Sequence, residues 1–256
     1  MNKSDLRAVF RYYEAQTDDS MLTVAVMRSA QDMGAELKLG CSVQSVAINE
    51  HGCEIQYLHD NSVQQLTAAS VVNAAGPWAN KVQALITPSQ PNVEVDLVQG
   101  THIILPFELG ENIYYIESPV DGRPVFVMPW YGDTMVGTTE LVFEDDPANT
   151  KPTGKEIEYL LKTFYANFPA IKNKNMPSCE SFSGLRVLPR SKENANKRSR
   201  ETIYLCDREN KPRVVSIFGG KLTAYRATAE IALSKIKESL PLRSAIADTK
   251  NISLFG

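Results

Sequence analysis

Residues 214–226 read V-V-S-I-F-G-G-K-L-T-A-Y-R, and the rest of the chain is organised around this stretch. β-Prone residues lead into Gly219 and Gly220, and apolar residues at helical spacing continue from Leu222 until Pro241 ends the pattern. The stretch therefore predicts a strand, a glycine turn and a helix. Such a turn directs free backbone N–H groups and the positive end of the helix toward a ligand that lies over the glycines.

The two common phosphate-binding motifs do not match this turn. A P-loop would have glycine in place of Val215 and Ser or Thr in place of Leu222. The dinucleotide fingerprint G-x-G-x-x-G occurs nowhere in the chain. An ordinary tight turn between a strand and a helix is the alternative interpretation.

The bulk composition is that of a globular protein. The chain has 256 residues, which suggests one large or two modest domains, with 43% hydrophobic and 22% charged residues. A net charge of −3 argues against a nucleic-acid partner, and the basic segment 192–200 is most simply a solvated loop. The 4 cysteines show no metal-ligating spacing, so free thiols and a cytoplasmic protein without a metal are predicted. No apolar run is long enough to span a membrane.

The N-terminal part contains a second glycine turn. A Thr-Asp-Asp sequence at 17–19 predicts a helix that Gly34 ends. Extended segments are predicted at 36–39, 42–48, 52–58 and 68–73. The last of these enters Ala74-Ala75-Gly76-Pro77-Trp78, in which Pro77 suits the first position of a helix. A ligand can approach the backbone closely at such small residues, although a plain connection is again the alternative.

Between the two turns the sequence is mostly β-prone. Strands are predicted at 93–98, 101–105, 113–116, 124–128, 134–137, 179–186 and 202–206. Thr153 and Glu156 form a capping-box pattern that opens a helix ending at Asn167. We therefore predict a mixed α/β fold, in which an incomplete doubly wound domain is interrupted by a domain with a mostly antiparallel sheet.

Three polar positions in the interrupting domain could carry chemistry. They are His102 at a strand start, Arg186 two residues after Gly184, and the sequence Thr138-Thr139-Glu140. Each has a structural alternative, namely a hydrogen-bonded histidine, a buried ion pair and a simple turn. No Ser-His-Asp or Cys-His spacing stands out.

Six motifs occur in the order found in FAD-dependent glycerol-3-phosphate dehydrogenases, and the chain resembles that family over nearly its whole length. The motifs are Asn73-Ala74-Ala75-Gly76-Pro77-Trp78, Gln99-Gly100-Thr101-His102, V-F-V-M-P-W at 125–130, Val136-Gly137-Thr138-Thr139, Ser183-Gly184-Leu185-Arg186 and residues 216–226. The sequence Y-E-A-Q-T-D-D at 13–19 fits the same family. The resemblance implies an amino-acid-oxidase-type flavoprotein. It divides the chain into a partial FAD-binding domain (1–90), a substrate domain (91–206) and a return to the FAD-binding domain (207–256).

The resemblance also implies roles for individual residues. The cofactor-binding residues would be Ala75, Gly76, Pro77 and Trp78 in the first turn, and Gly219, Gly220, Lys221, Leu222 and Thr223 in the second. Arg186 would hold the substrate phosphate or the product carbonyl, His102 would take the hydroxyl proton, and Thr139 would contact the substrate. The implied reaction is oxidation of sn-glycerol 3-phosphate to dihydroxyacetone phosphate by hydride transfer to FAD, with electrons passed to a quinone.

The chain departs from the family pattern in three respects. Val187 follows Arg186 where proline is frequent, and Gln99 stands where lysine is common, which removes a charge near the substrate. The unit that carries G-x-G-x-x-G is also absent. We therefore expect a fragment that binds FAD weakly or not at all and is inactive by itself.

Two other functions remain open at this stage. One is an oxidase fragment that uses oxygen and acts on a glycerol phosphate, an amine or an amino acid, with Arg186 holding a carboxylate in the last case. The other is a non-catalytic module that binds a partner chain carrying the missing FAD motif. For the parent enzyme we expect peripheral contact with the inner face of the cell membrane, and formation of a homo-oligomer is left open.

Overall fold

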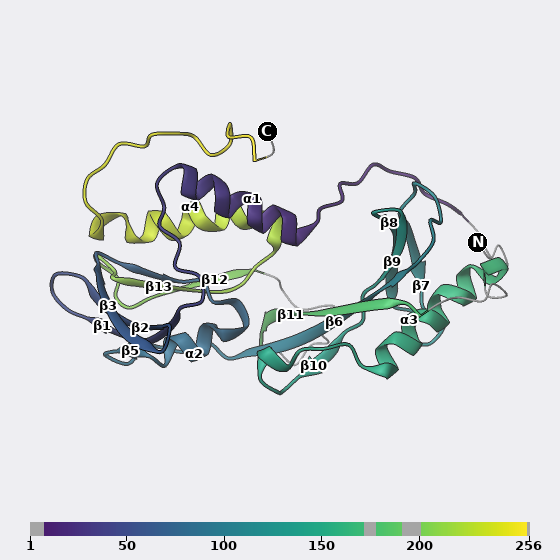
Figure 1. The fold of residues 1–256 in the computed structure, drawn as a ribbon, viewed down its shortest axis with the longest axis horizontal. Helices are drawn as coiled ribbons and strands as arrows, with labels where there is room; N and C mark the ends of the chain where they lie inside the picture. Colours follow the sequence, from purple (N-terminus) through teal and green to yellow (C-terminus); the bar gives the residue numbers. More distant parts are fainter. Residues whose placement is uncertain (1–7, 172–177, 191–200, 255–256) are drawn as a thin grey trace. The chain divides into compact units, whose positions relative to one another are not determined.

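The computed structural model describes residues 8–171, 178–190 and 201–254, and Figure 1 shows their helices and strands. These residues form two compact units. The first unit contains the described residues between 95 and 190, together with residues 8–10. The second contains residues 11–94 and 201–254. The basic segment 192–200, predicted to be a solvated loop, lies outside the described residues.

The first unit is built on a six-stranded antiparallel sheet. Its strands are β6 (Val95–Leu105), β7 (Tyr114–Glu117), β8 (Pro124–Trp130), β9 (Asp133–Gly137), β10 (Leu141–Phe143) and β11 (Glu180–Pro189). Strand β6 is central, because β11 pairs along the whole of one edge while β9 and β10 share the other. The segments predicted at 93–98 and 101–105 are therefore one continuous strand through Gly100.

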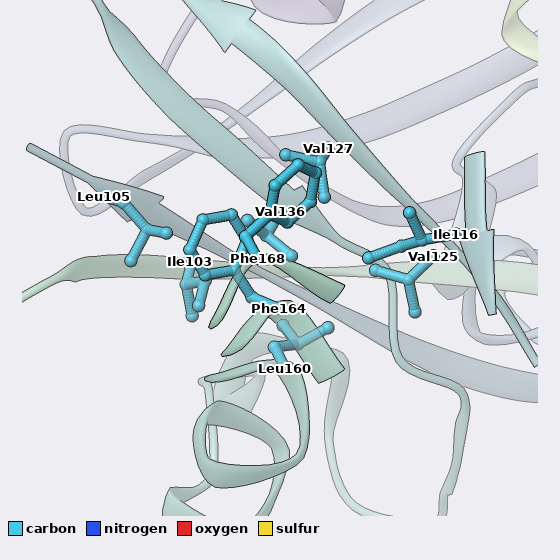
Figure 2. Close-up of a cluster of buried hydrophobic side chains, with 9 residues drawn as sticks. All are labelled: Ile103, Leu105, Ile116, Val125, Val127, Val136, Leu160, Phe164 and Phe168. Atoms are coloured by element: carbon cyan, nitrogen blue, oxygen red, sulfur yellow. The ribbon is translucent and has the colours of Figure 1, made fainter. Parts of the chain in front are cut away.

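Helix α3 (Gly154–Asn167) covers one face of this sheet. It begins with the predicted capping box, in which the Thr153 hydroxyl accepts from the Glu156 backbone N–H and the Glu156 carboxylate accepts from the Thr153 backbone N–H. Figure 2 shows the resulting core, in which helix side chains meet the alternate residues of β6, β8 and β9. The buried members are Ile103, Leu105, Ile116, Val125, Val127, Val136, Leu160, Phe164 and Phe168. Because strand side chains alternate, this packing leaves His102 on the opposite face.

The second unit contains two sheets. The larger, in the order β3-β2-β1-β5, comprises β1 (Ser42–Ile48), β2 (Cys53–His59), β3 (Ser62–Ala68) and β5 (Ile86–Thr87). The smaller, in the order β12-β13-β4, comprises β4 (Val71–Asn73), β12 (Thr202–Cys206) and β13 (Val214–Gly219). Val214 of β13 joins the buried cluster of the larger sheet, which includes Val46 and Ile86. The two sheets therefore share one core.

Helices flank the smaller sheet. Helix α4 (Tyr225–Ile236) lies against β12 and β13, and the Tyr204 hydroxyl of β12 contacts the Thr228 carbonyl oxygen of α4 at 3.4 Å. The short 3-10 turns η1 (Gly76–Trp78) and η5 (Leu222–Ala224) precede α2 (Ala79–Gln83) and α4, respectively, and η6 (Lys237–Ser239) follows α4. Helix α1 (Asp19–Asp32) starts at the predicted cap Asp18 and is followed by Gly34, whose φ is 95°.

The structure corrects three details of the sequence analysis. Residues 36–39 form no strand, whereas Ser62–Ala68, which was not predicted, forms β3. The strand predicted at 68–73 is confined to Val71–Asn73. Strand β12 pairs with β13 inside the second unit, whereas the predicted boundary between 206 and 207 would separate them. The polar sequence S-V-Q-Q-L-T-A explains the missed strand, since an edge strand needs little apolar alternation.

Candidate functional site

Both glycine turns lie at the same edge of the smaller sheet in the second unit. Strands β4 and β13 are parallel neighbours, with Asn73 opposite Ser216, so their carboxyl ends point the same way. Asn73 is buried and donates from Nδ2 to the Ala79 carbonyl and to Ser216 Oγ. Ser216 Oγ in turn donates to Gln83 of α2. This buried network fixes the two strand ends at the location where open α/β sheets bind ligands.

The backbone of each turn fits a closely approaching ligand. Gly76, Gly219 and Gly220 have φ values of 52°, 72° and 91°, which side chains adopt only under strain. A Cβ atom on Gly220 would lie 2.7 Å from Thr202 Oγ1. No side chain caps the start of η5 or of α4. Backbone N–H groups after Lys221 are therefore suited to a ligand that carries negative charge, as a reduced flavin ring does.

A hollow lies beside this second turn within the same unit. Its lining combines residues from the start of α1 with residues from η5 and α4, namely Gln16, Thr17, Asp18, Met21, Leu22, Leu222, Thr223 and Tyr225. Two of the predicted cofactor-binding residues, Leu222 and Thr223, thus border an open concavity, and Lys221 and Trp78 are exposed. The residues around the start of α1 were not predicted to belong to the site, because only the fold brings them close to residues 222–225.

The predicted catalytic residues lie together on the face of the six-stranded sheet opposite to α3. In the β6–β11 ladder His102 is opposite Phe182 and Gly100 is opposite Gly184. Directly opposite residues point to the same side, and Arg186 follows Gly184 by two residues, so it shares that side. We call the surface formed by His102, Gly100, Phe182, Gly184 and Arg186 the His102 face. It presents a ring at one end, a guanidinium at the other and, between them, the open backbone of Gly184, whereas Thr138 Oγ1 lies over Gly100.

The ring of His102 is held between two neighbouring strands. It stacks on Phe182 with centroids 5.0 Å apart and an interplanar angle of 11°. On the β9 side, a Cβ atom on Gly137 would lie 2.7 Å from both Cγ and Nε2 of this ring. The family motif at 136–139 thus has a local reason for its glycine, because only a residue without Cβ leaves space for His102.

Arg186 belongs to a cluster of three charged side chains. Its Nη1 lies 3.0 Å from Glu140 Oε1, and its Nη2 donates to the Thr139 carbonyl at 3.1 Å. The other Glu140 oxygen, Oε2, lies 2.6 Å from Arg123 Nη2. Neither Arg123 nor Glu140 was identified from the sequence as a partner of Arg186. The ion pair and the anion-holding role were alternatives for Arg186, and the ion pair is present.

Behind this cluster lies a buried polar network around Glu156. Its Oε1 accepts from Thr139 Oγ1 at 2.7 Å, and its Oε2 accepts from Gln99 Nε2 at 2.8 Å. Burial raises the pKa of Glu156, but hydrogen bonds from Thr139, Thr153 and Thr101 outweigh this effect, and the net pKa is lowered. The carboxylate therefore stays charged inside the protein.

Two expectations change as a result. Gln99 is 1% exposed and bonds to Glu156, so it lies on the α3 side of the sheet and not near the His102 face. The idea that its difference from lysine removes a charge near the substrate is therefore wrong. Thr139 is 5% exposed, and its hydroxyl donates to Glu156 and accepts from the Thr101 backbone. The geometry gives this hydroxyl a positioning function and does not support direct contact with a substrate.

Comparison with known proteins assigns the family. The family model of the FAD-dependent oxidoreductases matches residues 2–226. The chain belongs to this family. A solved structure of the glycerol-3-phosphate dehydrogenase from Bacillus halodurans complexed with FAD is similar in fold, with a TM-score of 0.72, 28% sequence identity and coverage of 86% of this chain and 43% of that one. The predicted fold class, mixed α/β, is thereby confirmed.

Two curated relatives show the kind of family member to which this chain is similar in sequence. The chain is 27% identical over 258 residues to the aerobic glycerol-3-phosphate dehydrogenase of Staphylococcus epidermidis, covering 96% of this chain and 45% of the relative. It is 33% identical over 248 residues to the glycerol-3-phosphate dehydrogenase of Pseudomonas aeruginosa, covering 92% and 46%. The chain thus spans less than half of the length of these relatives.

Residues 8–171, 178–190 and 201–254 contain no group of three or more His, Cys, Asp or Glu side chains arranged to hold a metal ion. All four cysteines are free thiols, as predicted. Within the same part of the chain, no helix has the length and apolar character that crossing a membrane requires.

Proposed function

We propose that this chain takes part in the flavin-dependent oxidation of sn-glycerol 3-phosphate to dihydroxyacetone phosphate, with a quinone as the final electron acceptor. The observation that carries the proposal is the His102 face, on which a cationic group and an imidazole flank bare backbone. Phe182, which lies opposite His102, is four positions from Arg186 along β11, and this corresponds to about 13 Å between the Cα atoms of Phe182 and Arg186. Side chains that lean inward from the ends can therefore both reach one three-carbon phosphate ester.

Each end of this face suits one part of the substrate. Arg186 would hold the phosphate, since a planar guanidinium matches two phosphate oxygens. His102 would accept the proton of the C2 hydroxyl on an imidazole nitrogen as the C–O bond becomes a carbonyl. The hydrogen on C2 leaves with its bonding electron pair, so the carbon is oxidised by two electrons. Gly184, where a Cβ would meet nothing within 4 Å, would leave room for the carbon chain.

The residues of the second unit would hold part of the cofactor. Residues 75–78 and 219–223 form the two glycine turns that would contact the cofactor. Bound FAD supplies the hydride acceptor. Exposed N–H groups near Lys221 would stabilise negative charge on a reduced flavin ring.

The test is an anaerobic assay of the protein with FAD, carried out on this chain and on its full natural reading frame. We expect that sn-glycerol 3-phosphate bleaches the flavin absorbance of the full reading frame and that quinone restores it. We expect weak or no flavin binding by the chain alone. Arg186→Gln should raise KM for the phosphate ester, whereas His102→Asn should lower kcat on the order of 10²–10⁴-fold. An unchanged KM in Arg186→Gln would remove the assignment of the phosphate site.

The oxidase alternative is separated from this proposal by its products. Peroxide formation in air at the rate of substrate oxidation, with no acceleration by quinone, would favour the oxidase. Bleaching by an amino acid in place of glycerol phosphate would reassign Arg186 to a carboxylate. The non-catalytic alternative predicts no bleaching by either substrate class, even with the partner chain that restores FAD binding.

A cytoplasmic location with peripheral contact at the inner face of the membrane is part of the same proposal, since a quinone acceptor dissolves in the lipid. Fractionation of cells that express the full reading frame tests it. The protein should sediment with membranes at low salt and be released by high salt without detergent. Light scattering of the purified protein then gives the oligomeric state, for which we propose no value.

A further inference from the structure

The carboxylate next to Arg186 poses a problem for anion binding. Glu140 lies just after β9, and its side chain is only 9% exposed. It engages Arg186 with one oxygen and Arg123 with the other. A single arginine neutralised by a buried glutamate would have little net attraction for a phosphate. With Arg123 included, two guanidinium groups and one carboxylate give the cluster a net charge of +1.

The exposure of the three side chains is also unequal. The side chains of Arg123 and Arg186 are 24% and 28% exposed, respectively, against 9% for Glu140. The positive groups therefore meet solvent while the negative group is largely covered. A ligand approaching the cluster encounters the guanidinium groups first, and the carboxylate acts mainly on their orientation.

Arg186 is restrained at a second point. Its Nη2 donates to the Thr139 carbonyl, and the residue that carries this carbonyl is itself fixed by Glu156 and by the Thr101 backbone. A Cβ atom on Gly100 would lie 3.3 Å from the same Nη2, so the guanidinium lies close over bare strand backbone. The two restraints on Arg186 therefore come from the adjacent residues Thr139 and Glu140, which bond to different nitrogens of its guanidinium group.

We propose that Glu140 is a positioning residue for Arg186 and that Arg123 restores the positive charge that Glu140 removes, so that the three residues together form a site for a phosphate dianion. This inference rests on the proposed function, in which Arg186 holds the anionic group of the substrate. It adds two residues to that site and explains how an arginine in an ion pair still binds an anion. It also favours a dianion over the single charge of a carboxylate, because the cluster retains positive charge after pairing.

The test measures binding of inorganic phosphate to the chain by calorimetry at low and high salt. Arg123→Gln, Glu140→Gln and Arg186→Gln are compared with Arg190→Gln. Arg190 is a matched control, since it pairs with Asp96 at 3.1 Å in the same unit and its side chain is 58% exposed. Removal of one charge within several ångströms of an anion changes its affinity on the order of tenfold.

The Arg123 and Glu140 substitutions should change the affinity for phosphate in opposite directions. Arg123→Gln should weaken phosphate binding about tenfold, whereas Glu140→Gln should tighten it severalfold at low salt and make it more dependent on salt. A positioning function requires a further readout. NMR relaxation of the Arg186 Nε–H group should show a rigid side chain in the wild type and a mobile one in Glu140→Gln, with Arg190 unchanged.

Each other outcome is informative. Equal weakening in Arg123→Gln and Glu140→Gln would show a general loss of structure and would overturn the compensation of charge. An Arg186 side chain as mobile in the wild type as Arg190 would overturn the positioning function. If Arg186→Gln abolishes binding while the Arg123 and Glu140 variants match Arg190→Gln, the inference fails and the proposed phosphate site stands. If Arg186→Gln binds phosphate as tightly as Arg190→Gln, or if the wild type itself binds no phosphate, the phosphate site and this inference both fail.

Discussion

Substitution of Gly137 by alanine separates the packing of His102 from its chemistry. The added Cβ would overlap Cδ2 of the ring and would lie 2.7 Å from Cγ and Nε2, against a normal carbon contact of about 3.5–4.0 Å. The ring must therefore retreat by at least about 1 Å. Phe182 limits this retreat, because its ring is already stacked on the other histidine face.

The size of the effect follows from three terms. Overpacking of a buried site costs about 1–3 kcal/mol, and the lost aromatic stack adds about 0.5–1.5 kcal/mol. Alanine also restricts the unfolded chain, which offsets about 0.4–1 kcal/mol. We expect a net loss of about 1–3 kcal/mol, or roughly 2–12 °C in Tm for a protein of this length. A displacement of about 1 Å at a catalytic group lowers kcat on the order of 10²-fold in the complete flavoenzyme.

Differential scanning calorimetry and histidine NMR check this prediction. The chain has only 3 histidines, so the ring resonances of His102 can be assigned by comparison with a His102→Asn variant. The resonance should lose the ring-current shift from Phe182 in Gly137→Ala. Gly184→Ala is the matched control, since a Cβ there meets nothing within 4 Å. It should leave Tm and the His102 resonance nearly unchanged. A Gly137→Ala protein with wild-type Tm and an unshifted His102 resonance would refute the reasoning.

Three further predictions concern stability. The pKa of Glu156 is lower in the folded protein than its ordinary value of 4.5, so its contribution to stability is present above that value and is lost as pH falls through the folded pKa. In urea unfolding between pH 7 and pH 3, the free energy of unfolding should therefore decline more steeply in the wild type than in Glu156→Gln. Thr153→Ala removes the cap of α3 and should cost about 1 kcal/mol in the same assay, whereas Ser→Ala at an exposed position such as Ser234 should change little. Arg213→Ala removes a guanidinium that bonds to the carbonyls of Ala69 and Glu50, and should destabilise the second unit by about 1–3 kcal/mol, measured by hydrogen exchange in β13.

The helices and hairpins of this protein could be predicted from short-range signals. The cap at Asp18, the capping box at Thr153 and the turn before Cys53 each depend on residues within a few positions of one another. The strand–turn–helix pattern at 214–226 likewise depends on local spacing, and it is present as β13, η5 and α4. These features were predictable because the backbone conformations and bonds that create them involve neighbouring residues.

The site required longer-range information. Gln99 was placed near the substrate because lysine is common there in the family, whereas the uninterrupted alternation of β6 puts Gln99 and His102 on opposite faces. The sequence showed Arg186 but not its partners, since Glu140 and Arg123 lie 46 and 63 positions away along the chain. No local pattern encodes such a pairing.

The sequence by itself thus determined the chemical groups available, namely one imidazole, one arginine after a glycine, and two glycine turns. Only the tertiary structure decided that strand pairing places His102 and Arg186 on one face and that β4 and β13 bring both turns to one edge. The physical reason is that a side chain gains its function here from charge and space supplied by other strands. In the first unit, the burial of alternate residues against α3 fixes the sheet register, and this register sets both around His102 and Arg186.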